Sequence, residues 1–187
     1  MKMNVRRKIP NAITFFNLSL GVIAILLVVD NRGLDFVIPA CLLILAAAFT
    51  DRFDGKIARM LDAETTIGKE LDSLSDLISF GIAPIVLTWK TCFYALGPIG
   101  YIIALIFVVS GTYRLARFNV TETRKYFTGI PITLAGSFLI LLNLYNCYIL
   151  LRHHQSQPLP FPNVIITSLF TLLLSYLMIS NIRINKK

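Results

Sequence analysis

The sequence predicts an all-α membrane protein: one bundle of six transmembrane helices with both termini in the cytoplasm. Three observations predict it: an apolar composition, six long apolar runs, and an uneven distribution of Lys and Arg. The chain has 187 residues, of which 56% are hydrophobic and 15% are charged, whereas a soluble domain is about 45–50% apolar and about 25% charged. This composition excludes an ordinary soluble enzyme and a disordered chain, which needs low hydrophobicity.

Six apolar runs are long enough to cross a bilayer, because a transmembrane helix needs roughly 20 mostly apolar residues. The predicted spans, in order, are Asn11–Val29, Phe36–Arg59, Gly68–Trp89, Pro98–Phe118, Ile130–Leu151 and Val164–Ile182. The first has a basic start but no small-residue cleavage site after it, so we expect it to remain as a helix. The second and third carry acidic residues at one end, and the fourth and fifth are the clearest apolar runs. Six spans leave no room for a soluble domain, so residues 1–187 are expected to form one integral-membrane domain.

Lys and Arg predict the orientation, because cytoplasmic connections carry an excess of these residues. With the N-terminus inside, all of them lie on the cytoplasmic side except Arg32, Lys90 and Arg152. Anionic lipid headgroups favour basic residues on that side. The net charge of +8 is therefore explained by membrane topology, and we expect no nucleic acid as a partner.

The segment 51–76, DRFDGKIARMLDAETTIGKELDSLSD, contains aspartates at helical spacing. An α-helix turns about 100° per residue, which places one set of residues on one face of the second span and another set on one face of the third. The first set is Asp51, Asp54, Gly55 and Ala58, and the second is Gly68, Asp72, Asp76 and Ser79. The short connection favours antiparallel neighbours, so four carboxylates are expected to converge at the cytoplasmic end of the bundle.

Converging carboxylates need a positive partner. Each ionised aspartate at membrane depth costs on the order of 2.5–3.5 kcal/mol, and mutual repulsion adds to this cost. Nearby basic residues are one candidate, namely Arg52, Lys56, Arg59 and Lys69. A divalent cation is the other, because oxygen ligands without nearby His or Cys suit Mg²⁺, Mn²⁺ or Ca²⁺. The small residues on these faces either allow close helix packing or leave a groove for a metal-bound diphosphate.

The pattern DxxDGxxAR, eight residues, GxxxDxxxD resembles the signature of the CDP-alcohol phosphatidyltransferase family without a gap. The matching positions are Asp51, Asp54, Gly55, Ala58, Arg59, Gly68, Asp72 and Asp76. The stretch 9–21, IPNAITFFNLSLG, is similar to the N-terminal region of the family. Three further stretches resemble its phosphatidylserine synthase branch: DSLSDLISFGIAP at 72–84, GTYRLARFN at 111–119 and FTGIP at 127–131.

The resemblance implies transfer of a phosphatidyl group from CDP-diacylglycerol to the hydroxyl of L-serine, with release of CMP. It implies Asp51, Asp54, Asp72 and Asp76 as ligands of a divalent metal, Mn or Mg and two ions, with Asp76 also the general base that removes the serine proton. The implied nucleotide-binding residues are Thr14, Asn17, Gly55, Ala58, Arg59, Thr65 and Gly68. It also implies a homodimer among membrane lipids, in the plasma membrane of a prokaryote, with the active site facing the cytoplasm.

Several of these residues have a second interpretation from the sequence. Thr14 and Asn17 could bond to the backbone of a neighbouring helix, and Arg59 could be an interface arginine whose charged end reaches the headgroups. Arg114 and Arg117 would suit the carboxylate of serine or the phosphate of the lipid. Equally, the excess of basic residues in cytoplasmic connections accounts for both arginines without a substrate.

Two other functions remain open at this stage. A sister enzyme would share the aspartate pattern but use glycerol phosphate, inositol phosphate or an archaeal CDP-linked lipid. A divalent-cation transporter is the alternative from another class, because carboxylates within the membrane also mark ion paths. A transport path would place acids near the middle of the bilayer, whereas here they gather at the cytoplasmic end.

Overall fold

The structure is a computed structural model that describes residues 5–30, 35–60, 65–120, 126–152, 159–181 and 183–185. The long helices are α1 (Val5–Asp30), α2 (Val37–Met60), α5 (Pro98–Val120), α6 (Ile132–Arg152) and α7 (Phe161–Ile179). Between α2 and α5 lie α3 (Thr66–Asp76), a π-helix η1 (Leu77–Ile82), α4 (Ala83–Thr91) and a 3₁₀ turn η2 (Phe93–Leu96).

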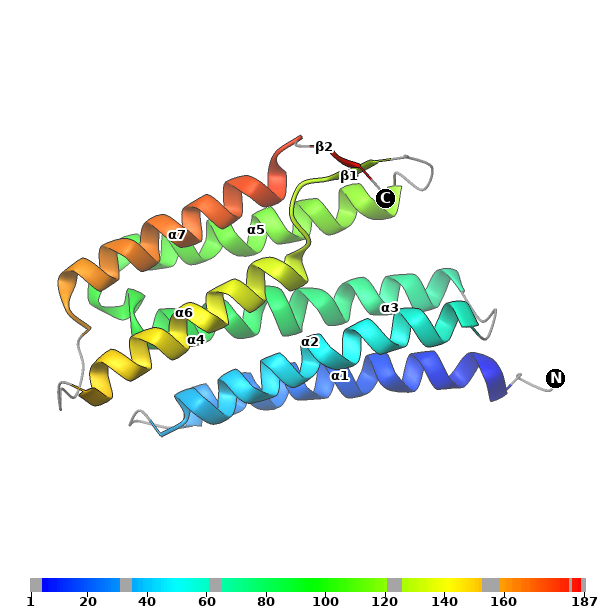
Figure 1. Cartoon of the computed structure of the whole chain (residues 1–187), viewed down its shortest axis with the longest axis horizontal. Helices are drawn as coiled ribbons and strands as arrows, with labels where there is room; N and C mark the ends of the chain where they lie inside the picture. The colour runs from blue at the N-terminus through cyan, green and yellow to red at the C-terminus, as the bar shows by residue number, and fades with distance from the viewer. Residues whose placement is uncertain are drawn as a thin grey trace.

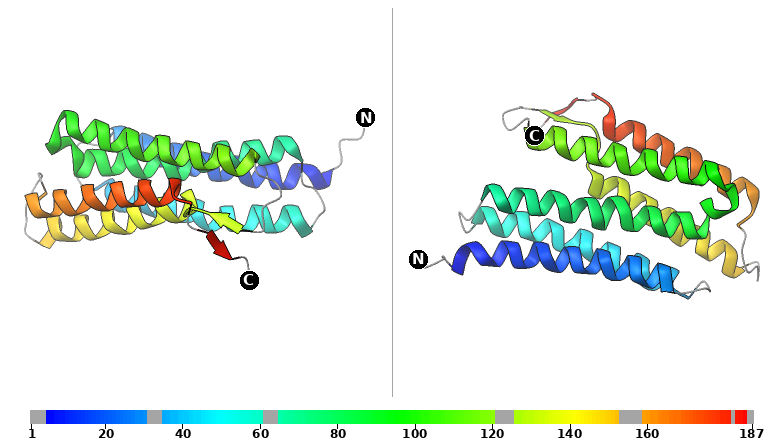
Figure 2. Two further views of the ribbon diagram at one scale, coloured as in Figure 1. Left: turned by 90° about the horizontal axis from the view of Figure 1, so that it is seen from above. Right: turned by 180° about the vertical axis from the view of Figure 1, so that it is seen from behind.

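The elements α3, η1 and α4 follow one another without a break and form a central rod. This rod contacts α1, α2, α5 and α6, while α1 packs along α2 and α5 packs along α7 (Figure 1). Figure 2 shows the same bundle from above and from behind. In these views α1 begins at the end of the bundle where α2 ends and α3 begins, and α7 runs toward this end but stops short of it.

The predicted all-α class is confirmed, with one small addition. The strand β1 (Tyr126–Thr128) pairs antiparallel with β2 (Arg183–Asn185), in the register Tyr126↔Asn185 and Thr128↔Arg183. The sequence did not predict this pairing, because the two strands lie more than fifty positions apart and each has only three residues. The pairing joins the connection after α5 to the chain after α7.

Five helices in the described part of the chain are long and apolar enough to cross a membrane: Pro10–Asp30, Thr66–Thr91, Pro98–Val120, Ile132–Arg152 and Phe161–Ile179. The predicted second span corresponds to α2, which has 24 residues but is not among the five. Its last ten residues, Asp51–Met60, include five charged side chains. The count of six spans and the cytoplasmic position of both termini stay predictions.

The start of the rod's π-helical segment is packed very closely against α6. A Cβ atom added at Gly136 would lie 2.5 Å from the carbonyl oxygen of Phe80 and 3.0 Å from its Cα. Only a glycine permits this approach between the two backbones. Phe80 lies one turn after Asp76. The contact with Gly136 therefore attaches the rod to α6 close to the acidic residues of α3.

The other half of the bundle is held by buried polar contacts between α4 and α6. The amide of Asn143 donates to Thr88 Oγ1 at 2.7 Å, and Thr91 Oγ1 donates to Asn143 Oδ1 at 2.9 Å. Hydrogen bonds of this kind join helices in membranes, where apolar burial gives little drive for association. The rod is therefore fixed along its length, which positions the residues at its acidic end.

Candidate active site

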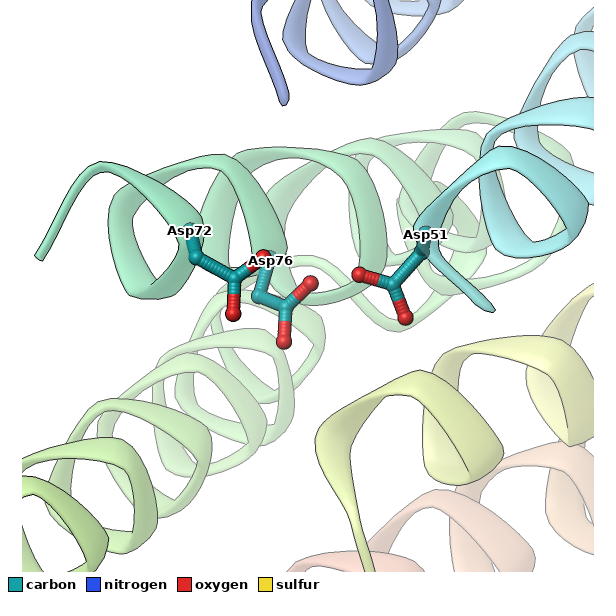
Figure 3. A group of neighbouring side chains, drawn as sticks. All are labelled: Asp51, Asp72 and Asp76. Carbon is teal, nitrogen blue, oxygen red and sulfur yellow. The ribbon is translucent and has the colours of Figure 1, made fainter. Parts of the chain in front are cut away.

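Three aspartates converge where α2 ends and α3 begins. Asp51 comes from α2, and Asp72 and Asp76 come from α3. Each offers a carboxylate oxygen, and these three oxygens lie within 4.8 Å of one another. Figure 3 shows the carboxylates of Asp51 and Asp76 pointing toward each other, with that of Asp72 beside them. The structure thus brings together three of the four expected carboxylates, and the side chain of Asp54 lies outside the described residues.

The start of α3 explains why Asp72 and Asp76 share a face. Thr65 is the N-cap residue, and its Oγ1 accepts a hydrogen bond from the backbone N–H of Gly68 at 3.0 Å. A threonine at this position satisfies a backbone donor that the helix itself leaves unpaired. Because the helix begins at Thr66 and continues without interruption to Asp76, residues four apart stack on one side.

The first helix touches the rod through hydroxyl groups. Ser75 Oγ donates to the backbone carbonyl of Thr14, and Ser79 Oγ donates to that of Asn17, both at 3.2 Å. Thr14 Oγ1 donates to the carbonyl of Pro10 at 3.1 Å, within its own helix. Both Thr14 and Asn17 are therefore in the interface with the rod that carries Asp72 and Asp76.

The side chain of Asn17 is completely buried, at 0% exposure. Neither its Nδ2 nor its Oδ1 has a hydrogen-bond partner among the described residues. A buried amide without partners costs free energy, about 1–3 kcal/mol per lost hydrogen bond. Of the two interpretations of Asn17, a side-chain bond to a neighbouring helix backbone is not seen in the described part of the chain, whereas contact with a bound molecule is compatible with its unpartnered amide.

Gly55 lies in the second half of α2, one turn after Asp51. It is exposed, and a Cβ atom added there would meet no atom within 4 Å in the described part of the chain. This open space is compatible with the interpretation in which the small residues leave room for a ligand. The side chains of Ala58 and Arg59, in the same turn of α2, lie outside the described residues.

The two expected anion-binding arginines have different surroundings. Arg114 is buried, with 9% exposure, and its guanidinium interacts electrostatically with Asp76. Its Nε has no hydrogen-bond partner among the residues that the structure describes. Arg117, one turn further along α5, instead donates hydrogen bonds to the end of α7. The structure therefore places Arg114, and not Arg117, next to the acidic cluster.

A polar contact between α3 and α5 was not anticipated. Asn119 Nδ2 donates to Ser73 Oγ at 3.1 Å and to Glu70 Oε2 at 3.3 Å. Ser73 immediately follows Asp72, so the contact joins the last turn of α5 to the acidic part of α3. Asn119 belongs to the stretch GTYRLARFN, but the identity of its partner depends on how the helices pack.

The oxygen-rich cluster fits a divalent cation. Three carboxylates at this separation repel one another unless a positive charge lies between or beside them. Hard cations such as Mg²⁺, Mn²⁺ and Ca²⁺ take carboxylate ligands, and no His or Cys is part of the cluster. The residues present therefore suit such an ion, and their geometry does not distinguish one from another.

The opposite end of the rod carries an aromatic group. The ring centroid of Trp89 lies 5.6 Å from that of Tyr94 and 5.4 Å from that of Tyr101. Trp and Tyr are enriched at membrane–water interfaces. Asp72 and Trp89 are seventeen positions apart along the rod, which corresponds to about 25 Å at the helical rise. A hydrocarbon core is about 30 Å thick, so this separation along the rod is comparable to the thickness of that core.

Comparison with known proteins agrees with this arrangement. Residues 7–178 match the family described as CDP-alcohol phosphatidyltransferase. The chain is 35% identical to the CDP-diacylglycerol–serine O-phosphatidyltransferase of Bacillus subtilis, covering 94% of this chain and 88% of that protein. It is 34% identical to the protein of the same name in Helicobacter pylori, covering 98% and 74%. It is 38% identical to the archaetidylserine synthase of Methanothermobacter thermautotrophicus, covering 68% and 54%.

The family match covers nearly the whole chain and includes both helices of the acidic cluster. The three carboxylates that meet in space belong to the aspartate pattern that the sequence analysis identified, and α2 and α3 carry them. The chain belongs to the CDP-alcohol phosphatidyltransferase family.

Proposed function

We propose that the protein transfers a phosphatidyl group from CDP-diacylglycerol to the hydroxyl of L-serine, giving phosphatidylserine and CMP. The observation that carries the proposal is the convergence of Asp51, Asp72 and Asp76 beside the buried Arg114. Serine is favoured as the acceptor because the relatives from Bacillus subtilis and Helicobacter pylori are named for serine transfer.

A second lipid donor is supported by one specific observation. The archaeal relative is named archaetidylserine synthase, and it is 38% identical over the part that aligns. That name keeps serine as the acceptor and changes the lipid. A CDP-linked archaeal lipid is therefore the second candidate donor. Membership of a transferase family argues against the cation-transporter alternative.

The reaction needs one bond to form and one to break. The serine oxygen forms a bond to the phosphorus that carries the diacylglycerol, and the bond from that phosphorus to the oxygen of the CMP group breaks. The serine hydroxyl proton passes to a base, and we assign this role to the carboxylate of Asp76. Asp76 is suited to it because its carboxylate belongs to the acidic cluster and also interacts electrostatically with Arg114.

The four signature aspartates, Asp51, Asp54, Asp72 and Asp76, are the residues that would hold divalent metal, with Mn or Mg the expected ion and two ions the expected number. When bound, such ions neutralise the charge of a diphosphate and stabilise the charge that develops during phosphoryl transfer. By binding carboxylates from both α2 and α3, such ions would also hold these two helices together.

The nucleotide is assigned to the groove beside the end of α2. The proposed contacts are Thr14, Asn17, Gly55, Ala58, Arg59, Thr65 and Gly68. Two observations support this position: the open space at Gly55 and the unpartnered amide of Asn17 among the described residues. The N-terminus of α3, capped by Thr65, adds backbone N–H groups and a favourable dipole for an anionic group.

We assign to Arg114 the binding of a substrate group that has two anionic oxygens. A guanidinium presents a planar set of donors that matches a carboxylate or a phosphate. The serine carboxylate and the lipid phosphate share this chemistry, and the burial of Arg114 makes such a contact strong. Its position near Asp76 places the bound group close to the carboxylate that receives the proton.

The topology and assembly follow from the same proposal. If α2 crosses the membrane in addition to the five apolar helices, the six spans would place both termini and the active site on the cytoplasmic side of a prokaryotic plasma membrane. The position of the cluster opposite the aromatic end of the rod supports an interfacial site. We also expect a homodimer surrounded by membrane lipids, and crosslinking in native membranes would detect it.

The first test uses purified protein in detergent with CDP-diacylglycerol, L-serine and either Mn²⁺ or Mg²⁺, and it follows CMP release and the lipid product. We expect serine-dependent CMP and phosphatidylserine, both lost in Asp76→Asn. The matched control is Asp30→Asn, an exposed aspartate at the end of α1 away from the cluster. Product with glycerol phosphate or inositol phosphate but not serine would overturn the acceptor, and product only with a CDP-linked archaeal lipid would change the donor.

A further inference from the structure

Arg114 and Arg117 lie one helical turn apart on α5, but their side chains go to different places. Arg114 is buried and interacts electrostatically with Asp76. Arg117 donates from Nη1 to the carbonyl of Ile179 at 3.1 Å and to Asn181 Oδ1 at 3.2 Å, and from Nη2 to the carbonyl of Ser180 at 3.4 Å. Its guanidinium also lies 5.9 Å from the ring centroid of Tyr113.

These acceptors are at the C-terminal end of α7. The last carbonyls of a helix have no partner within the helix and carry partial negative charge, so an arginine there is doubly favourable. Ile179 is the last residue of α7, and the next two residues supply the other acceptors. Arg117 therefore acts as a cap for α7 that is supplied by a different helix.

A second contact reaches the same end of α7 from the FTGIP stretch. The backbone N–H of Ile130 donates to the carbonyl of Leu177 at 3.2 Å. Gly129 has φ +76°, and a Cβ atom added there would collide with the carbonyl of Met178 and lie 3.2 Å from Nη2 of Arg117. A glycine is needed both for this backbone conformation and for the space.

Two stretches that resemble the phosphatidylserine synthase branch thus meet at one point. Arg117 belongs to GTYRLARFN and Gly129 to FTGIP, and both contact the end of α7. The pairing of β1 with β2 lies next to them along the chain. The last turns of α5, which carry Arg114, are consequently attached to the end of α7 on this side.

We infer that Arg117 is a positioning residue: by capping α7, it holds the last turns of α5 and so keeps Arg114 in place beside Asp76. Arg117 then affects substrate binding only through Arg114. The inference rests on the proposed function for its kinetic effect, whereas the cap itself does not depend on any activity. Direct binding of a substrate by Arg117, as the sequence suggests, is the competing outcome.

The kinetic test compares Arg117→Gln, Arg117→Lys, Gly129→Ala and the double variant Arg117→Gln/Gly129→Ala with Arg114→Gln. Gly129→Ala disturbs the cap from the other side and leaves Arg117 in the chain. We expect Arg117→Gln and Gly129→Ala each to raise the KM for the same substrate that Arg114→Gln affects, by about tenfold, the size of effect that a lost charged hydrogen bond gives. The double variant should be no worse than either single variant, because both act through one contact.

Lysine separates charge from geometry. It keeps the positive charge that the end of α7 favours but loses the planar set of donors, so Arg117→Lys should fall between the unmodified protein and Arg117→Gln if the residue is a cap. The matched control is Arg152→Gln, an exposed arginine at the end of α6, which should leave the kinetics unchanged. If Gly129→Ala is normal while Arg117→Gln and Arg117→Lys both raise a KM to the same extent, Arg117 binds substrate directly and the inference is wrong.

An activity-independent measurement completes the test. Hydrogen exchange of the intact protein in detergent should become faster at residues 126–130 and 177–181 in Arg117→Gln, and not in Arg152→Gln. Unchanged exchange at these residues would overturn the cap. If the unmodified protein shows no transfer to serine, the proposed function fails, and the exchange result alone still decides whether Arg117 caps α7.

Discussion

Asn119 and Ser73 exchange hydrogen bonds across the contact between α5 and α3. Asn119 Nδ2 donates to Ser73 Oγ at 3.1 Å, and in the alternative direction Ser73 Oγ donates to Asn119 Oδ1 at 3.2 Å. Ser73 lies between Asp72 and Asp76 in the chain. The helix that carries Asp72 and Asp76 and the helix that carries Arg114 are therefore joined next to Asp72 and about one and a half turns from Arg114.

Removal of this contact should loosen the acidic end of the bundle. Asn119→Ala is expected to cost about 0.5–1.5 kcal/mol of stability, the usual net value of a hydrogen bond, and to lower kcat/KM. Ser73→Ala should give a similar loss, and the double variant should not be additive. Thermal unfolding in detergent and CMP release measure the two effects. Ser19→Ala is the matched control, because that exposed hydroxyl bonds only to Phe15 of its own helix; equal losses in Ser19→Ala would contradict the prediction.

Loss of one carboxylate should change the metal requirement. Asp72→Asn and Asp51→Asn remove a negative ligand from the cluster, and cation affinity follows the number of charged ligands. We expect the Mn²⁺ or Mg²⁺ concentration for half-maximal CMP release to rise by more than about tenfold, since the charge of a bound divalent ion is large in a partly buried site. Addition of EDTA to the unmodified protein should abolish release, and added metal should restore it. Metal dependence identical to that of Asp30→Asn would contradict a ligand role.

Two glycines should respond in opposite ways to the same change. Gly136→Ala places a Cβ atom against the carbonyl of Phe80, so we expect a loss of about 1–3 kcal/mol, as for an overpacked core. Gly55→Ala meets no described atom within 4 Å, and alanine favours a helix more than glycine does, so its unfolding temperature should not fall. If the groove at Gly55 receives the nucleotide, this variant should still raise the KM for CDP-diacylglycerol. An unchanged KM would place the nucleotide elsewhere.

The contact between α4 and α6 should contribute to stability and not to catalysis. Asn143→Leu removes the bonds to Thr88 and Thr91, while both threonines keep bonds to carbonyls of their own helix. We expect a loss of about 0.6–1.7 kcal/mol, the range found for such bonds in membrane helices. Unfolding in detergent measures the loss, and the KM values for both substrates should be unchanged. A selective change in one KM would show that this end of the bundle takes part in substrate binding.

The acidic cluster could be predicted from the sequence because it depends on local periodicity. Asp72 and Asp76 are four residues apart on one helix, and the short connection to α2 leaves few positions for Asp51. The partners of Arg117 could not be predicted, because Ile179 and Asn181 lie more than sixty positions later. The role of Thr65 as an N-cap was predictable from the sequence, because a threonine just before a helix typically accepts a hydrogen bond from the backbone N–H three residues later.

The helical class was equally accessible, since long apolar runs determine it. The membrane status of α2 was harder to predict, because its second half carries the charges of the family signature. The strands β1 and β2 could not be anticipated from six residues with no strong alternation. For Asp54, Ala58 and Arg59, whose side chains lie outside the described residues, the sequence-based expectations stay predictions.

The length of the rod has a consequence for the lipid surroundings. Trp89 lies near one end and the carboxylates lie toward the other, about 25 Å away by helical rise, so in a bilayer the depth of the cluster beneath the headgroups would depend on bilayer thickness. In a thin bilayer the cluster would meet the phosphate level directly, and in a thick one either the rod would stand more upright or the headgroups would be drawn inward. If the proposed function holds, transfer should therefore vary with the acyl-chain length of the surrounding lipids.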